Sequence, residues 1–175
     1  RLGLDEALEA DLPGEFDYGS QARLFIPRDM PEASDEGSFG LLTAYIRRIL
    51  EITEGHAFLL FTSFRQMHRV YQALREDGDY PLLLQGEKPK SAILQQFRKT
   101  PRCVLCATSS FWQGVDVRGD ALRAVVVDKL PFQVPTDPVV SARFSRMKMK
   151  GLDPFKEYAI PSAVISLRQG LGRLV

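Results

Sequence analysis

Short apolar runs that alternate with helical patterns constrain this chain more strongly than any other feature. Four predominantly apolar runs are of the type found in fully buried strands: 57–61, 82–84, 104–107 and 122–127. Strands of this kind occur in parallel sheets whose two faces are both covered by helices. The pattern therefore predicts an α/β fold with three layers, in which a mostly parallel central sheet carries helices on both faces.

The remaining apolar patterns predict one more strand and several helices. The strand is expected at 22–27. A long helix should begin at Ser38 as its N-cap, run to about Glu54 and be closed by Gly55. A second helix should follow residue 63, with one apolar face made of Met67, Val70, Tyr71 and Leu74. Two further helices are expected over 139–149 and 161–173.

The length of the chain favours a single domain. A chain of 175 residues is long enough to bury one hydrophobic core. Residues 1–22 mix acidic side chains with Pro and Gly, and we interpret them as a connector into a domain that occupies 23–175. The chain begins with Arg1 rather than Met and ends in an apolar Leu-Val pair. We expect both ends to be cut points within a longer protein.

Charge is distributed unevenly along the chain. Lys plus Arg (23) nearly balance Asp plus Glu (22), so the net charge of +1 gives no polybasic signal for a nucleic acid or a membrane surface. Residues 1–100 hold 12 basic and 16 acidic side chains, whereas residues 101–175 hold 11 basic and 6 acidic ones. We therefore expect a polyanion to contact residues 101–175 rather than residues 1–100. The sequence shows neither a membrane-spanning stretch nor a secretory signal, so we expect no membrane partner and a cytoplasmic location.

Two cysteines, Cys103 and Cys106, form a C-x-x-C pattern that elsewhere suggests a metal or redox site. Here they lie in an apolar strand, where side chains three positions apart point to opposite faces of the sheet. Thiols on opposite faces cannot bind the same metal ion. We therefore interpret both as small buried hydrophobes and expect no metal site in this chain.

The loops at the carboxyl ends of the strands are where a ligand site is expected. In open parallel sheets, ligands bind where these loops lead into helix N-termini. This rule selects four loops: 62–63, 85–87, 108–119 and 128–137.

The third loop begins with the most informative string of the sequence, C-A-T-S-S-F-W-Q-G-V-D-V. Thr108 and Ser109 follow a buried strand, where small hydroxyls and backbone amides suit a phosphate oxygen of a nucleotide or a nucleic acid. Gly114 allows close backbone approach, and Asp116 can accept hydrogen bonds from a ribose or an arginine. Each part has a structural alternative, because Thr-Ser-Ser is ordinary helix-cap chemistry and Gly-x-Asp is a common turn.

This string resembles motif V of superfamily 2 helicases in the XPD and DinG branch, where A-T-x-x-F-W-x-G-V-D is typical. Gln113 stands where that branch usually has glutamate. The following string, V-V-V-D-K-L-P-F-Q-V-P-T-D-P over 125–138, is similar to a segment of bacterial DinG-type helicases. The chain thus resembles the second, C-terminal RecA-like motor domain of a DinG-type DNA helicase.

The last ten residues are similar to motif VI, Q-x-x-G-R-x-x-R, and the chain ends before the final arginine of that motif. The resemblance implies that this domain reaches toward ATP held by a partner domain, with Arg173 and Gln169 as catalytic residues. In phosphoryl transfer generally, such an arginine is worth ~10³ to 10⁵ in rate. The resemblance assigns five residues to nucleotide binding: Gly114, Asp116, Gln169, Gly172 and Arg173.

The string F-L-L-F-T-S-F resembles motif IV of the same family. The resemblance places Thr62 and Ser63 against a backbone phosphate, although a strand that ends in Thr-Ser before a helix is also ordinary N-cap chemistry. On the same side, facing single-stranded DNA, it places Thr108, Ser109 and Trp112. Trp112 keeps two interpretations: a base-stacking side chain, worth ~1 to 3 kcal/mol, or a hydrophobic plug beneath the motif V loop.

Some parts of a complete motor are absent from the sequence. No segment fits the phosphate-binding pattern G-x-x-x-x-G-K-[ST], and two cysteines cannot supply the four ligands of the iron–sulfur cluster found in many members of the branch. The resemblance implies that ATP and Mg²⁺ are bound mainly by a first motor domain N-terminal to Arg1, which would also hold any iron–sulfur cluster.

We therefore expect the isolated chain to be inactive and the full-length protein to be an ATP-dependent 5′–3′ DNA helicase that acts in repair or replication. Two alternatives stay open. One is a catalytically silent, nucleic-acid-binding RecA-like module, and the other is the motor domain of a DinG-type exonuclease.

Overall fold

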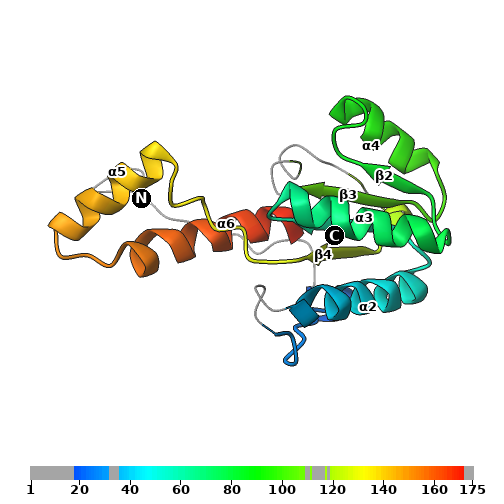
Figure 1. Cartoon of the computed structure of the whole chain (residues 1–175), viewed down its shortest axis with the longest axis horizontal. Helices are drawn as coiled ribbons and strands as arrows, with labels where there is room; N and C mark the ends of the chain where they lie inside the picture. The colour runs from blue at the N-terminus through cyan, green and yellow to red at the C-terminus, as the bar shows by residue number, and fades with distance from the viewer. Residues whose placement is uncertain (1–17, 32–35, 109–110, 112–116, 118, 172–175) are drawn as a thin grey trace.

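The strands form one parallel sheet. The computed structural model describes residues 18–31, 36–108, 111, 117 and 119–171. In this part of the chain, four strands pair in the order β2-β3-β1-β4, and every pair is parallel (Figure 1). Their bounds are β1 Ala57–Phe61, β2 Leu82–Leu84, β3 Val104–Thr108 and β4 Ala124–Val127. The predicted α/β fold with a parallel central sheet is confirmed.

Helices connect the strands and follow the last one. The described α-helices are α1 Tyr18–Gln21, α2 Glu36–Thr53, α3 Phe64–Asp77, α4 Lys90–Lys99, α5 Pro138–Met149 and α6 Ile160–Leu171. A 3₁₀ turn, η2 Gly119–Ala121, precedes β4, and a π-helical turn, η3 Phe155–Ala159, leads into α6. None of the helices in the described ranges is both long and apolar enough to span a membrane.

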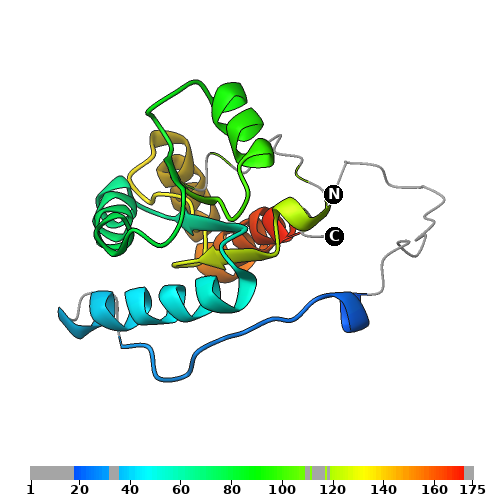
Figure 2. The same ribbon diagram turned by 90° about the vertical axis from the view of Figure 1, so that its right-hand side faces the viewer.

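Apolar side chains form two cores, one on each side of the sheet. The first core joins the sheet to α4 and includes Phe58, Leu60, Leu105, Ile93 and Phe97. The second core joins the opposite side to α2 and α3 and includes Leu59, Phe61, Ile46, Met67 and Val70. Strand residues alternate between the cores because successive side chains of a strand point to opposite faces. The predicted three layers are confirmed, and in Figure 2 α2 and α4 lie on opposite sides of the strands.

The two cysteines belong to different cores. Cys103 lies in the first core and Cys106 in the second, and both are buried. Burial raises the pKa of the Cys103 thiol to about 11 and also raises the pKa of Cys106. The prediction that these thiols point to opposite faces of the sheet is confirmed.

Helix α3 begins and ends at residues suited to helix termini. Ser63 is its N-cap, and the Ser63 hydroxyl accepts a hydrogen bond from the Gln66 N–H at 3.2 Å. Gly78, at φ +73°, is its C-cap, and the Gly78 N–H donates to the Leu74 carbonyl. The buried face of the helix is the predicted one, made of Met67, Val70, Tyr71 and Leu74.

The expected N-terminal strand is absent. Residues 22–31 form no strand, and Leu24, Phe25 and Ile26 are exposed. A strand needs a neighbour to pair with, but the edges of the sheet are β2 and β4, and neither pairs with this segment. The apolar side chains alone therefore do not make it a strand.

The starts of α2 and β4 also differ from the prediction. Helix α2 begins at Glu36, so Ser38 lies inside the helix rather than at its N-cap. Strand β4 begins at Ala124 instead of residue 122, because the turn η2 ends at Ala121 and the two following residues complete the entry into the strand. Leu122 is still buried in the first core.

Helices α5 and α6, with η3 between them, form a hairpin that extends beyond the carboxyl ends of the strands (Figure 1). We call this hairpin the arm. Val140 is buried, whereas most of α5 is exposed. The ring of Phe132, in the loop before α5, lies 5.5 Å from the ring of Phe155. At the end near the sheet, Leu167 of α6 and Val127 of β4 each pack against the first core.

The amino edge of the sheet contains a close contact between two turns. Gly55 has φ +81°, and a Cβ at this position would clash with the Arg102 carbonyl oxygen. The Arg102 N–H donates to His56 Nε2 at 3.2 Å. Glu54, His56 and Arg102 all have positive φ, which residues other than glycine rarely adopt. The turn that enters β1 is therefore held against the turn that enters β3.

Candidate functional site

Four polar residues lie at the carboxyl edge of the sheet. Thr62 follows β1, Gln85 follows β2 and Asp128 follows β4, while Thr108 is the last residue of β3. The strand order places them in the sequence Gln85, Thr108, Thr62, Asp128 along this edge. We call these residues the carboxyl-edge row and take it as the candidate site, because ligands of parallel sheets bind at this edge.

Asp128 ends the pairing of β4 with β1. Its N–H donates to the Leu60 carbonyl at 3.0 Å, as the parallel ladder requires. The next ladder bond would join the Thr62 N–H to the Asp128 carbonyl. Instead, the Thr62 N–H donates to Asp128 Oδ1 at 2.9 Å, and the Thr62 hydroxyl lies 3.5 Å from Oδ2. The carboxylate takes the place of the backbone carbonyl, and the chain leaves the sheet here.

Partial burial is the largest influence on the pKa of the Asp128 carboxyl group. Desolvation raises the pKa of Asp128 above its ordinary value, because water stabilises the charged form less well at this site. The Thr62 N–H and the Lys129 ammonium lower this pKa, since each favours the carboxylate, but desolvation is the largest effect. A hydrogen bond to an ionised acceptor is stronger than one between neutral groups.

Gln85 ends the pairing of β2 with β3 in the same way. Its N–H donates to the Cys106 carbonyl at 2.9 Å, which continues the ladder. The Thr108 N–H then donates to Gln85 Oε1 at 2.6 Å, and the Thr108 hydroxyl lies 3.0 Å from the same oxygen. Thr108 is buried at 6% exposure. A side-chain oxygen thus ends the β1–β4 ladder at Asp128 and the β2–β3 ladder at Gln85.

The predicted DNA-facing residues that the structure describes differ in accessibility. Thr62 and Ser63 are both exposed, in the connection between β1 and α3. The capping role of Ser63, kept as an alternative in the sequence analysis, is confirmed, and its contact with phosphate stays a prediction. Thr108 lies in the same row, but its side chain is buried and hydrogen-bonded to Gln85.

Most predicted nucleotide-binding residues lie outside the described residues. They are Gly114, Asp116, Gly172 and Arg173, and the predicted DNA-facing residues Ser109 and Trp112 also lie outside the described residues. Gln169 belongs to the last turn of α6. Phe111 and Val117, which flank part of the motif V string, are both buried in the first core. The two interpretations of Trp112 therefore stay open.

The loops predicted to bind a ligand include Gln85 and Asp128, but the sequence pattern assigns neither residue a role. A signal was present, since each is the first polar residue after an apolar strand. The sequence does not, however, give the register between the strands. Register decides which backbone N–H lies opposite each of these side chains, and a one-residue shift would change it.

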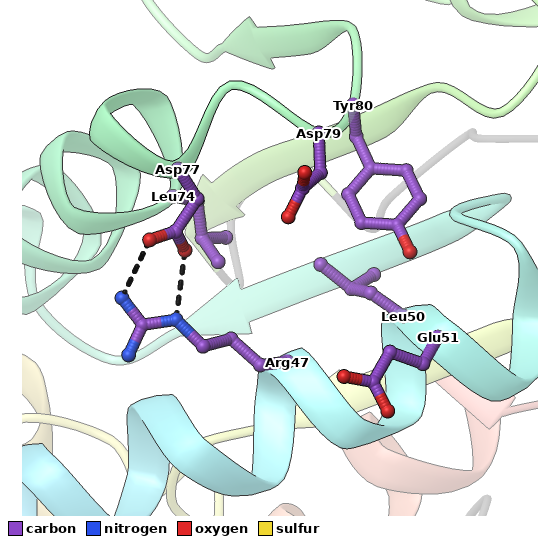
Figure 3. Close-up of a pocket in the computed structure, with 7 residues that line it drawn as sticks. All are labelled: Arg47, Leu50, Glu51, Leu74, Asp77, Asp79 and Tyr80. Carbon is purple, nitrogen blue, oxygen red and sulfur yellow. Dashed lines mark hydrogen bonds and ion pairs between the residues drawn. The ribbon is translucent and has the colours of Figure 1, made fainter.

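A cavity of about 260 Å³ lies at the opposite, amino edge of the sheet. It is lined by α2, by the end of α3 and by residues before β2, including Tyr80 (Figure 3). Arg47 and Asp77 form a two-point ion pair beside it, with nitrogen–oxygen distances of 2.7 and 2.9 Å. No predicted site residue lines this cavity. Among the described residues, no group of three or more His, Cys, Asp or Glu is arranged to hold a metal ion.

Comparison with known proteins adds the family context. The model of a family described as the helicase C-terminal domain matches residues 46–175. The ATP-dependent DNA helicases YoaA of Escherichia coli (strain K12) and Haemophilus influenzae are 46% and 42% identical over 175 residues. The 3′-5′ exonuclease DinG of Bacillus subtilis is 31% identical over 185 aligned residues. All three alignments cover this whole chain, but the chain spans only 28%, 27% and 20% of those proteins.

Proposed function

Since this chain belongs to the helicase C-terminal domain family, we propose that it is the second motor domain of an ATP-dependent, DinG-type DNA helicase. The observation that carries the proposal is the family match, which includes every strand of the described sheet. The two YoaA relatives, each called an ATP-dependent DNA helicase, support it.

In this proposal, ATP is shared between two motor domains of one longer protein. The first motor domain binds most of the ATP and Mg²⁺, because this sequence has no phosphate-binding loop of its own. This chain adds Gly114 and Asp116 from motif V, and Gln169, Gly172 and Arg173 from motif VI. Arg173 supplies positive charge where negative charge develops on the γ-phosphate. The chain is therefore inactive alone.

Single-stranded DNA binds, in this proposal, along the carboxyl edge of the sheet. Thr62 and Ser63 are exposed where α3 begins, and a helix N-terminus favours a phosphate group. Thr108, Ser109 and Trp112 belong to the neighbouring motif V segment. The basic excess of residues 101–175, with 11 basic and 6 acidic side chains, supports contact with a polyanion. As the cleft between the two motor domains closes and reopens, the protein moves 5′ to 3′ along the strand.

Arg173→Ala in the full-length protein tests the ATP side of the proposal. DNA-stimulated ATP hydrolysis should fall by a factor on the order of 10³ or more, because transition-state charge loses its compensating cation. DNA affinity should stay largely unchanged. Steady-state hydrolysis and fluorescence anisotropy with labelled DNA measure the two quantities. Arg75→Ala, which removes the same charge from the exposed end of α3, is the control and should hydrolyse ATP normally. Normal hydrolysis by Arg173→Ala would mean that the motif VI assignment is wrong.

A second candidate function is supported by one relative. The Bacillus subtilis protein that matches this whole chain is called a 3′-5′ exonuclease. The alternative is therefore that this chain is the motor domain of a DinG-type exonuclease. Incubation of the full-length protein with a 5′-labelled strand annealed to a complementary strand separates the two candidates: progressive shortening of the labelled strand supports the exonuclease, and ATP-dependent release of the intact labelled strand supports the helicase.

A further inference from the structure

The connection between β1 and α3 is only two residues long, and each of them is fixed by a hydrogen bond. Strand β1 ends at Phe61 and α3 begins at Phe64. The Thr62 N–H is held by Asp128 at 2.9 Å, and the Ser63 hydroxyl is held by the Gln66 N–H at 3.2 Å. The second contact lies within α3, but the first reaches 66 residues along the chain to the end of β4.

Asp128 is suited to hold this connection without touching DNA itself. Its carboxylate is half-buried, and one of its oxygens accepts the Thr62 N–H. A carboxylate and a phosphate are both anions, so direct contact between them would be unfavourable. Any effect of Asp128 on DNA must therefore pass through the position of Thr62.

A backbone carbonyl could not hold Thr62 in the same way. Had the β1–β4 ladder continued, the Asp128 carbonyl would accept the Thr62 N–H, and the strand pair would extend by another residue. The side chain accepts this N–H instead, so β4 ends at Val127 and the chain departs toward the arm while Thr62 keeps its partner. An apolar side chain at this position would leave the Thr62 N–H without that acceptor.

We propose that Asp128 is a positioning residue that orients the Thr62–Ser63 connection for DNA by accepting the Thr62 N–H. This inference rests on the proposed function, because it takes that connection as a DNA contact. It adds a residue from outside motif IV to those that affect DNA binding. This residue lies at the end of β4, where the chain leaves the sheet toward the arm.

The test compares Asp128→Ala with Asp128→Asn in the full-length protein. Asp128→Asn keeps an acceptor oxygen for Thr62, whereas Asp128→Ala removes it. For Asp128→Ala, the single-stranded DNA concentration that half-saturates ATPase stimulation should rise roughly fivefold, the ratio that corresponds to one net hydrogen bond. The rate at saturating DNA should stay near that of the wild type. Asp128→Asn should restore the wild-type half-saturating concentration.

The control is Asp77→Ala, which removes a carboxylate from the Arg47 ion pair at the opposite edge of the sheet (Figure 3). It should leave the half-saturating DNA concentration unchanged, even if it lowers the melting temperature. If Asp128→Ala does not fold, Asp128→Ser repeats the test with a side chain too short to reach Thr62.

Failure of the positioning role can be distinguished from failure of the proposed function. A wild-type protein whose ATPase responds to DNA, combined with an unchanged half-saturating concentration in Asp128→Ala, overturns the positioning role alone. An equal rise in Asp128→Ala and Asp128→Asn overturns it as well, because the acceptor oxygen would then not matter. A wild-type ATPase that does not respond to DNA overturns the proposed function and this inference with it.

Discussion

At the scale of single residues, the two threonines of the carboxyl-edge row already use backbone donors within the protein. The Thr62 N–H is bonded to Asp128, and the Thr108 N–H is bonded to Gln85. A phosphate oxygen only accepts hydrogen bonds, so it needs donors that are not already used. The Ser63 hydroxyl accepts from Gln66 and keeps its own proton to donate. Ser63 is therefore the stronger phosphate donor of the described predicted residues.

The cysteines give a residue-scale prediction. Burial raises the pKa of Cys103 to about 11, so the reactive thiolate is scarce at neutral pH, and neither thiol is accessible. We expect a thiol reagent such as DTNB to leave both cysteines of the native chain unlabelled and to label both after unfolding in urea. Labelling of two thiols in the folded protein at a rate close to that in urea would contradict the buried assignment.

At the scale of elements, the sequence predicted those whose own residues decide their structure. Strand β1 and helix α3 were predicted because five consecutive apolar residues precede a Ser N-cap and a regular apolar face. The strand expected at 22–27 failed because strand formation needs a partner, and hydrophobic residues alone do not provide one. The candidate site was predicted only in part. The positions of its loops follow from the predicted strands, but the hydrogen bonds accepted by Gln85 and Asp128 depend on the register between strands that are far apart in the sequence.

Two glycine substitutions test the contact at the amino edge. Gly55→Ala combines a positive φ of +81° with a clash against the Arg102 carbonyl, so the free energy of unfolding should fall by on the order of 3 kcal/mol. Gly78→Ala is the matched control, because its φ of +73° is similar and its added Cβ meets nothing within 4 Å. It should cost about 1 kcal/mol. Urea unfolding monitored by circular dichroism measures both. Equal losses would contradict the close approach of Gly55 to Arg102.

At the scale of the whole molecule, the two edges of the sheet differ in what they offer. The amino edge is closed by turns in mutual contact and carries the cavity beside Arg47. The carboxyl edge carries the exposed Thr62 and Ser63, and the arm extends beyond it (Figure 1). This asymmetry is what a domain needs if it works against a second domain and a DNA strand on one side. The chain spans about a quarter of its YoaA relatives, which leaves room in such proteins for that second domain.

We propose that this domain contributes to ATP hydrolysis without performing it alone. The most direct test is the steady-state rate of ATP hydrolysis at saturating single-stranded DNA and Mg²⁺, measured side by side for the isolated chain and for the full-length protein. We predict DNA-stimulated turnover by the full-length protein and none above background by the isolated chain, because the chain has no phosphate-binding loop. Robust turnover by the isolated chain would mean that this domain hydrolyses ATP without a partner domain.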